Sequence, residues 1–415
     1  MRIQNLQNWL TRKLANLVDL KVAIVGQGYV GLPLAMAAAK AGLNVIGLDN
    51  NSSKVSSLND SISTIEGVDL RELKKVISEG NYFATEDFSK IADVEIVVIC
   101  VPTPLTTDGK PDLNFLIEAT TEVAKNMLKG TLVIVESTVA PGTIRNVLVP
   151  TIKSESKFED HDFLVAFSPE RVDPLNDFWG IENTPKLLSA LSEDGYRLAF
   201  DFYSKFVNTI VKCDSVEVAE TAKLLENSFR LVNISFINEI AIFCRKIDIE
   251  VDQVIRAAAT KPFGFMPFFP SIGVGGHCIP VDPIYLSNKA KEVKAPITMI
   301  ESAANINTWL WKYFVKLAKK ELGNLIGKRI LVIGISYKPN IKDIRESPAI
   351  KLIQELRALG ASVFWHDNLV QTWGEEVSTD LNESFDLAIV ATYHEKLELA
   401  KLGNMPKIDT RGLLG

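Results

Sequence analysis

Short apolar runs alternate with helical patterns along the first third of the chain. Each run is rich in β-branched residues and ends in a turn or polar residue, which is typical of a strand buried on both faces. The small-residue segment 34–41 stops at Gly42 and predicts a helix after the first strand. Strands and helices in this alternation predict a doubly wound parallel sheet. The predicted strands are residues 21–25, 44–48, 94–101 and 132–135.

The middle of the chain has a helical pattern instead. Apolar residues recur at helical spacing over residues 216–244 and again over 297–322, so each stretch predicts one long helix. A Pro- and Gly-rich stretch, residues 262–283, lies between them and is predicted to be a loop. Loops of this length inside a compact protein usually carry function.

The strand and helix alternation then returns. Residues 329–333, 362–366 and 386–391 are apolar runs that predict strands. Ser347 as N-cap and Pro348 as first helical residue predict a helix that ends near Gly360. The predicted fold is therefore α/β, with two Rossmann-type doubly wound parallel-sheet domains joined by a central helical domain with a long connecting helix. The expected boundaries are 1–212, 213–308 and 309–415.

Composition narrows the possible partners. The formal charge of −6 comes from interspersed charges, and no basic block suggests nucleic acid or an anionic membrane as a partner. The four cysteines are far apart, which argues against a disulfide scaffold or a metal site. The first twenty residues include four charged residues and resemble an amphipathic helix rather than a signal peptide. We therefore expect a cytoplasmic protein.

The first predicted strand leads into the pattern Gly26-x-Gly28-x-x-Gly31, and Asp49 ends the second strand. Glycines at this spacing allow a tight turn, close approach of a pyrophosphate and packing of the helix on the strand. Asp49 can accept hydrogen bonds from ribose hydroxyls. No Arg or Lys occurs in residues 50–53 to neutralise a 2′-phosphate, so NAD is favoured over NADP. The alternative is a tight turn in a doubly wound protein of another kind.

Cys278 stands in a Gly-rich segment that is too irregular for a core strand, whereas Cys100 lies in an apolar run. The flanking glycines would let a substrate approach the backbone, and Asp282 follows four residues later. Cys278 is a candidate nucleophile, although a loop cysteine is more often unreactive. His277 is expected to have a structural or rim role.

Lys223 and Asn227 are spaced to share one face of the long helix, with Glu220 one turn earlier. Two interpretations stay open. This polar stripe is either a solvated helix face or part of a buried site in which the lysine binds an oxyanion.

Together these segments resemble the UDP-glucose/GDP-mannose dehydrogenase family, the nucleotide-sugar 6-dehydrogenases, over essentially the whole chain. The matching motifs are Gly26 to Pro33, Val101-Pro102-Thr103-Pro104, Glu136-Ser137-Thr138-Val139, Ser168-Pro169-Glu170-Arg171-Val172, Ala222 to Asn227, Gly275-Gly276-His277-Cys278, and Tyr337-Lys338 through Arg345-Glu346-Ser347.

The resemblance implies a four-electron oxidation of a sugar C6 hydroxyl with two molecules of NAD. Cys278 would form a thiohemiacetal and then a thioester. Lys223 would stabilise the oxyanion, Asn227 would bind a sugar hydroxyl and Asp282 would exchange protons with Lys223. Thr138 and Glu170 would orient the hydrolytic water.

The resemblance also implies binding residues. The NAD ligands would be Gly26, Gly28, Tyr29, Val30, Gly31, Asp49, Thr103, Thr138 and Arg345. The UDP-sugar ligands would be Glu170, Arg171, Lys223, Asn227, Phe265, Gly275, Lys338 and Arg411. No metal is implied, and the two-fold habit of the family implies a homodimer or higher homo-oligomer.

Within the family, residues 261–268 and 168–174 look most like the branch that oxidises UDP-N-acetylglucosamine. UDP-N-acetylmannosamine and UDP-glucose are the alternative substrates. Ser271-Ile272 and Leu175-Asn176 depart from the family pattern and bear on sugar preference. Two further alternatives are a non-catalytic nucleotide-sugar-binding protein and a one-step hydroxyacid dehydrogenase.

Overall fold

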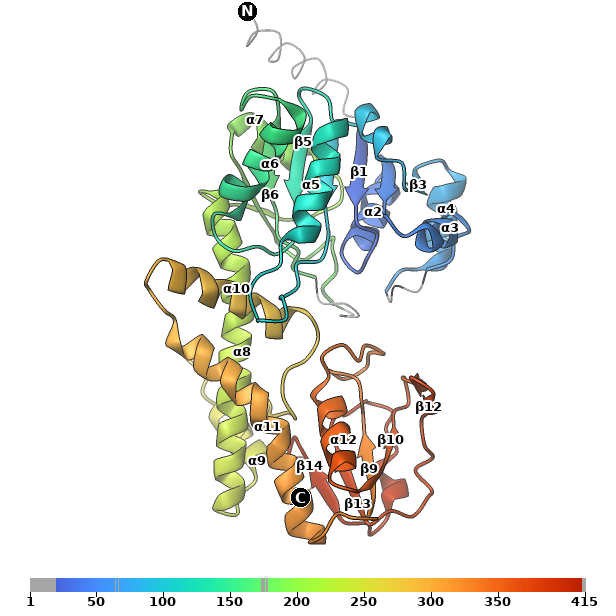
Figure 1. The fold of residues 1–415 in the computed structure, drawn as a ribbon, viewed down its shortest axis with the longest axis vertical. Helices are drawn as coiled ribbons and strands as arrows, with labels where there is room; N and C mark the ends of the chain where they lie inside the picture. The colour runs from blue at the N-terminus through green and yellow to red at the C-terminus, as the bar shows by residue number, and fades with distance from the viewer. Residues whose placement is uncertain (1–19, 64, 66, 173–175, 177, 413–415) are drawn as a thin grey trace, which may run out of the picture. The chain divides into compact units, whose positions relative to one another are not determined.

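A computed structural model describes residues 20–63, 65, 67–172, 176 and 178–412 of the chain (Figure 1). The chain divides into two compact units, which we call unit 1 (residues up to 224) and unit 2 (residues from 225). The amphipathic helix expected in the first twenty residues lies outside the described residues, apart from Leu20.

Unit 1 is built on an eight-stranded sheet of order β3-β2-β1-β4-β5-β6-β7-β8. Neighbouring strands are parallel except for β6 and β7, so the predicted parallel sheet carries one antiparallel pair. The four predicted strands are confirmed, although the run 94–101 contributes only the four residues of β4. The strands are β1 Lys21–Val25, β2 Asn44–Leu48, β3 Tyr82–Thr85, β4 Ile96–Ile99, β5 Leu132–Val135, β6 Leu164–Phe167, β7 Lys186–Ala190 and β8 Ile210–Lys212.

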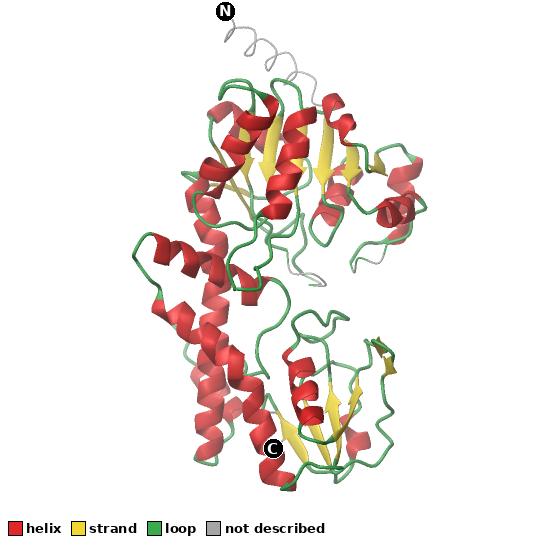
Figure 2. Cartoon of the chain, in the orientation of Figure 1, coloured by secondary structure: helices red, strands yellow, loops and turns green. Residues whose placement is uncertain are grey.

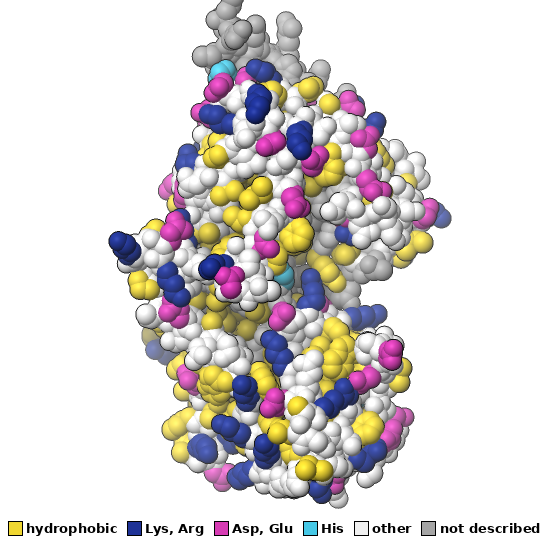
Figure 3. Space-filling view, in the orientation of Figure 1, with side chains coloured by type: hydrophobic (Ala, Val, Ile, Leu, Met, Phe, Trp, Pro, Cys, Tyr) yellow, Lys and Arg dark blue, Asp and Glu magenta, His cyan; other side chains and the backbone are white. Residues whose placement is uncertain are grey.

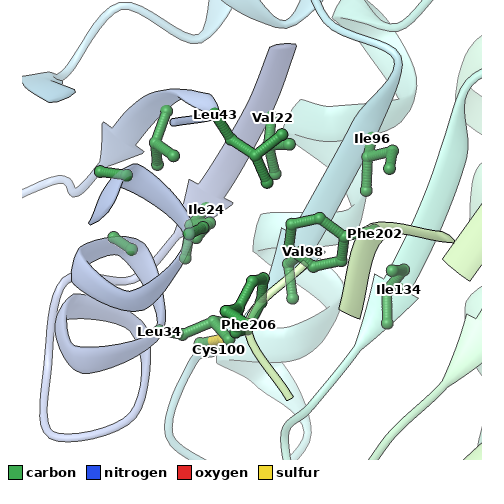
Figure 4. Packing of buried hydrophobic residues seen from close by; sticks show 14 of the residues in the cluster. Val22, Ile24, Leu34, Leu43, Ile96, Val98, Cys100, Ile134, Phe202 and Phe206 are labelled. Atoms are coloured by element: carbon green, nitrogen blue, oxygen red, sulfur yellow. The ribbon is translucent and has the colours of Figure 1, made fainter. Parts of the chain in front are cut away.

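Helices cover both faces of this sheet (Figure 2). Because side chains alternate along a strand, Val22 and Ile24 pack into one core and Ala23 and Val25 into the other. In the first core the aromatic ring of Phe206 lies beside Cys100 (Figure 4). The helical segments are α2 Gly31–Lys40, α3 Ser52–Asn59, α4 Leu70–Ser78, η2 Phe88–Asp93, α5 Asn114–Asn126, η3 Ile144–Leu148, α6 Val149–Ser156 and α7 Glu193–Tyr203.

Unit 2 combines helices with a second parallel sheet of order β10-β9-β13-β14, which confirms the second Rossmann-type sheet. The predicted long helices are present as α8 and α11. The elements are α8 Val216–Lys246, which begins in unit 1, α9 Val251–Ala259, α10 Cys278–Glu292, α11 Thr298–Leu322, β9 Arg329–Ile333, α12 Pro348–Ala358, β10 Ser362–His366, β11 Thr372–Trp373, β12 Glu376–Val377, β13 Leu387–Val390, η4 Leu399–Leu402 and β14 Lys407–Asp409.

The Pro- and Gly-rich loop is shorter than predicted, because α10 begins at Cys278. Pro280 fits the first turn, where a backbone N–H has no helical partner, and Pro283 is tolerated inside the helix. The prediction of a loop up to residue 283 was therefore wrong for its last six positions.

The exposed face of α8 carries large apolar side chains, whereas the exposed face of an amphipathic helix is usually polar. Leu225, Phe229, Phe236 and Phe243 are 45–60% exposed and lie within an arc of about 40° on the helix. The opposite face is buried, although it carries Glu220, Lys223, Asn227, Ser235 and Asn238. The solvated-face interpretation of the polar stripe is wrong, since these side chains are less than a tenth exposed.

Glu220 caps the segment that follows β5. Its carboxylate accepts hydrogen bonds from the backbone N–H groups of Gly142, at 2.6 Å, and Ile144, at 2.9 Å. Burial raises the pKa of Glu220 to about 7, against the opposing effect of these two bonds. Glu217, on the same helix, pairs with Arg145 at 2.7 Å, and this pair lowers its pKa.

These two carboxyls predict opposite pH dependences of stability. A raised folded-state pKa means that the stabilisation from Glu220 is complete below the unfolded value of 4.5 and is lost as the pH rises to about 7. Relative to Glu220→Gln, the wild type should therefore lose about 3 kcal/mol between acid and neutral pH. Thermal melting as a function of pH measures this difference.

Glu217→Gln is the matched control on the same helix. Because the pKa of Glu217 is lowered, its stabilisation is present above its unfolded pKa and is lost as the pH falls. If the difference in melting temperature between the wild type and Glu220→Gln stays constant with pH, the raised pKa of Glu220 is contradicted.

Candidate active site

The glycine pattern of unit 1 forms a strand, a tight turn and a helix. Gly26 has a φ of +91°, and a Cβ there would lie 2.5 Å from the carbonyl oxygen of Cys100. A Cβ on Gly31 would lie 1.8 Å from the carbonyl oxygen of Gly26. Both positions therefore require glycine for packing within the protein.

Gly28 differs, because a Cβ there would meet no atom within 4 Å. The turn therefore leaves open space at Gly28, three residues before the first residue of α2. A helix N-terminus offers free N–H groups and a positive dipole end to a pyrophosphate. Tyr29 is partly exposed at this turn, and Val30 is the N-cap residue of α2. These residues fit a dinucleotide.

Asp49 lies at the end of β2 and is buried. Its Oδ2 accepts hydrogen bonds from the backbone N–H of Gln27, at 2.8 Å, and from Nζ of Lys54, at 2.7 Å. Lys54 lies one residue beyond the cation-free segment 50–53 and was not predicted from the sequence as a partner of Asp49. The pair holds a carboxylate and an ammonium together where a ribose hydroxyl would bind, which suits both donation and acceptance of hydrogen bonds.

Thr103 and Thr138 lie on neighbouring loops at the carboxyl end of the sheet. The buried hydroxyl of Thr103 donates to the carbonyl of Thr138 at 2.8 Å. The hydroxyl of Ser137 donates to the carbonyl of Val101 at 2.7 Å. Two side chains thus tie the loop after β4 to the loop after β5.

Glu170 and Lys223 form one largely buried ionisable pair of unit 1. Lys223 Nζ lies 3.8 Å from Glu170 Oε2, and the two side chains are 8% and 19% exposed. Burial raises the pKa of Glu170, and the Lys223 ammonium opposes this effect. The backbone N–H of Val172 donates to Glu170, and the neighbouring Arg171 donates to the carbonyl of Pro185 at 2.7 Å.

Asn227, Asp282 and Cys278 belong to unit 2. Asn227 Nδ2 donates to Asp282 Oδ2 at 2.6 Å, and both side chains are buried. Asp282 lies one helical turn after Cys278, which is the first residue of α10 and is exposed. A helix N-terminus favours negative charge and therefore a thiolate. The interaction of Asn227 with Asp282 thus anchors the helix that presents the cysteine.

The segment before Cys278 packs against the loop after β9. A Cβ on Gly275 would lie 2.6 Å from Cβ of Tyr337, and a Cβ on Gly276 would lie 2.7 Å from its ring. The N–H of Gly276 donates to the carbonyl of Arg345 at 2.9 Å. His277 is the N-cap residue of α10, and burial lowers its pKa, so it stays neutral.

The remaining predicted ligands lie elsewhere in unit 2. Lys338 is half-buried, and its carbonyl accepts a hydrogen bond from Ser336 at 3.1 Å. Arg345 pairs with Asp343, and its side chain is half exposed. Arg411 lies 5.9 Å from the ring of Phe269. Phe265 is 40% exposed.

Among the described residues, no cluster of three or more His, Cys, Asp or Glu could hold a metal ion. Within the same residues, no helix is both long and apolar enough to cross a membrane. Basic and acidic side chains are mixed over the face shown in Figure 3.

Comparison with known families covers most of the chain. Models of the UDP-glucose/GDP-mannose dehydrogenase family match residues 20–207 as its NAD binding domain, 217–309 as its central domain and 331–414 as its UDP binding domain.

Individual relatives agree with this match. The chain is 34% identical to the UDP-N-acetyl-D-glucosamine 6-dehydrogenase of Pseudomonas aeruginosa, over 94% of each chain. It is 33% identical to the UDP-N-acetyl-D-mannosamine dehydrogenase of Pyrococcus horikoshii, over 91% of this chain and 90% of that protein. The solved structure of the UDP-D-ManNAc dehydrogenase from Pyrococcus horikoshii has a TM-score of 0.87 at 32% identity, and covers 94% of this chain and 95% of that chain.

Because of the open space at Gly28, we expect a substitution there to weaken cofactor binding without changing the stability of the fold. Gly28→Ala should melt like the wild type, because the new Cβ meets nothing in the protein. Its dissociation constant for NAD should rise by roughly tenfold, or about 1.4 kcal/mol, if the pyrophosphate occupies that space. Calorimetric titration with NAD measures this change.

Gly180→Ala is the matched control, because a Cβ at Gly180 also meets no atom within 4 Å. If Gly28→Ala binds NAD as tightly as the wild type, the pyrophosphate does not occupy the space at Gly28.

Proposed function

Because the chain belongs to the UDP-glucose/GDP-mannose dehydrogenase family and is an NAD-dependent UDP-sugar dehydrogenase, we propose its specific reaction. It oxidises the C6 hydroxyl of UDP-N-acetylglucosamine to a carboxylate in a four-electron reaction. The observation that carries the proposal is the bond from Asn227 to Asp282, which anchors the helix headed by Cys278. Binding alone needs no exposed cysteine at a helix start, so a non-catalytic binding protein is not favoured.

Cys278 is the proposed nucleophile. Its thiolate attacks the C6 aldehyde carbon and forms a C–S bond, and the carbonyl oxygen becomes an oxyanion. Bound NAD supplies the hydride acceptor for each of the two oxidations. Oxidation of the thiohemiacetal leaves a thioester, and water then breaks the C–S bond to release the acid and the thiol.

Lys223 and Glu170 supply the charges for these steps. The Lys223 ammonium stabilises the oxyanion, since it is buried and an ion in a low dielectric acts strongly on a nearby charge. Glu170 and Thr138 orient the hydrolytic water, and the carboxylate of Glu170 accepts a proton from it. Asp282 exchanges a proton with Lys223, and Asn227 binds a sugar hydroxyl.

The remaining roles follow the resemblance. The nucleotide sugar contacts Arg171, Phe265, Gly275, Lys338 and Arg411, in addition to Glu170, Lys223 and Asn227. NAD contacts Tyr29, Val30, Thr103, Thr138 and Arg345, in addition to the glycine loop and Asp49. The paired Asp343 holds Arg345 in a fixed orientation, which supports its use as a ligand.

Relatives named as UDP-N-acetyl-D-glucosamine and UDP-N-acetyl-D-mannosamine dehydrogenases are 34% and 33% identical to the chain. The two sugars differ in the configuration of one substituent, which a few loop contacts decide. Ser271, at one departure from the family pattern, is anchored by Asn238, which accepts its N–H at 2.8 Å.

We also propose three domains, residues 1–212, 213–308 and 309–415, and a homodimer. The ranges of the three family models support the domain boundaries. The exposed apolar face of α8 supports the dimer, because four large apolar side chains in one arc are costly to leave in water.

The stoichiometry of NADH tests the reaction. Purified protein with UDP-N-acetylglucosamine should form about two NADH per sugar consumed, because the oxidation removes four electrons. Cys278→Ser should form no acid, and Cys213→Ser is the control because Cys213 is a half-buried thiol in unit 1. A ratio near one, or undiminished acid formation by Cys278→Ser, would contradict the mechanism. The epimer and UDP-glucose, assayed in parallel, establish the preferred sugar.

The dimer is tested at the exposed face of α8. Phe236→Lys should convert a dimer into a monomer in light scattering, because it places a charge in the proposed apolar interface. Ile62→Lys changes an equally exposed apolar residue of unit 1 and should leave the mass unchanged. A wild type that is monomeric at micromolar concentration would refute the dimer.

A further inference from the structure

A second buried ion pair lies at the carboxyl end of the unit 1 sheet, and no step of the proposed reaction uses it. Lys186 Nζ lies 2.9 Å from Glu136 Oε1, and the side chains are 11% and 2% exposed. Glu136 follows β5, and Lys186 is the first residue of β7. Since β7 runs antiparallel to β6, its first residue lies at the carboxyl end of the parallel strands.

Tyr203 completes the cluster. Its hydroxyl donates to the same oxygen of Glu136 at 2.5 Å, and the Lys186 ammonium lies 4.7 Å from its ring centroid. Burial and Glu136 raise the pKa of Tyr203 well above its usual value, so the phenol keeps its proton. The charged members of the cluster are therefore Lys186 and Glu136.

The cluster is joined to the proposed catalytic carboxyl. The backbone N–H of Glu170 donates to the carbonyl of Glu136 at 3.4 Å. Thr138 is two residues from Glu136 in the same loop. A purely structural role is a weak explanation of a buried ion pair, because well-packed apolar residues usually stabilise a core as well.

We propose that Lys186, held by Glu136 and Tyr203, is a positioning residue that keeps the Glu170 carboxyl ionised at neutral pH. This inference rests on the proposed role of Glu170. A buried carboxyl reverts to its neutral form unless cations offset its desolvation. Glu170 has two such cations, Lys223 from α8 and Lys186 from β7.

The electrostatic balance at Glu170 supports this assignment. Burial raises its pKa; Lys223, the backbone N–H of Val172 and Lys186 lower it, in that order, and Glu136 raises it. The Cys100 thiol, which also faces the cluster, has a pKa well above its usual value because it is buried, so it adds no charge. The two cations therefore favour the ionised form of the Glu170 carboxyl, whereas Glu136 and burial favour its neutral form.

The test is Lys186→Met, which removes the cation and keeps much of the side-chain volume. The ionisation midpoint of Glu170, followed by infrared difference spectra against Glu170→Gln, should rise by about one pH unit. The acidic limb of the rate of acid formation should shift by the same amount, with the rate at high pH retained. Lys186→Arg restores a cation and should return both midpoints towards the wild-type values.

Tyr203→Phe is the matched control, because it removes a hydrogen bond to Glu136 and no charge. It should lower the melting temperature and leave the Glu170 midpoint in place. A Lys186→Met midpoint equal to that of the wild type would overturn the inference. The infrared titration needs no turnover, so a wild type that forms no acid would refute the proposed function and still leave this inference tested.

Discussion

The buried polar face of α8 is the constraint on which the functional part of this protein depends. A buried polar group costs free energy unless it has a hydrogen-bonding partner, so each such residue requires a loop or helix to meet it. Glu220 accepts a hydrogen bond from the loop after β5, Lys223 pairs with Glu170, and Asn227 donates a hydrogen bond to Asp282. Further along the helix, Ser235 donates to the carbonyl of Ala303 on α11, and Asn238 accepts the N–H of Ser271. Within each unit, this helix face thus positions the segments that it contacts.

This arrangement explains why charged residues are tolerated in the interior of unit 1. Glu170 and Lys223 are both buried, and Glu136 with Lys186 forms a second buried pair nearby along the sheet edge. In a low dielectric each charge acts strongly on the others, so the protonation state of one carboxyl depends on several elements. Such coupling between buried charges costs stability, but it also allows the pKa of a group that must hold or move a proton to be adjusted.

Glycine has two distinct uses in this protein. Gly31 and Gly276 are required because protein atoms occupy the space of their side chains, whereas Gly28 leaves space that no protein atom fills. In the sequence alone, these glycines look equivalent. Only the tertiary contacts separate a glycine that permits packing from one that leaves room for a ligand.

The sequence by itself determined the local parts of this protein. The strands β1, β2 and β5, the helices α8 and α11, and the glycine turn with Asp49 could all be predicted, because each depends on residues close together in the chain. The family motifs added roles for Cys278, Lys223 and Glu170, which remain predictions. The tertiary structure decided which face of α8 is buried, that α10 begins at Cys278 and that Lys186 pairs with Glu136. The Lys186 and Glu136 pair joins residues fifty positions apart, and the buried face of α8 depends on partners as distant. Burial and charge pairing depend on these distant partners, and periodicity along one segment does not reveal them.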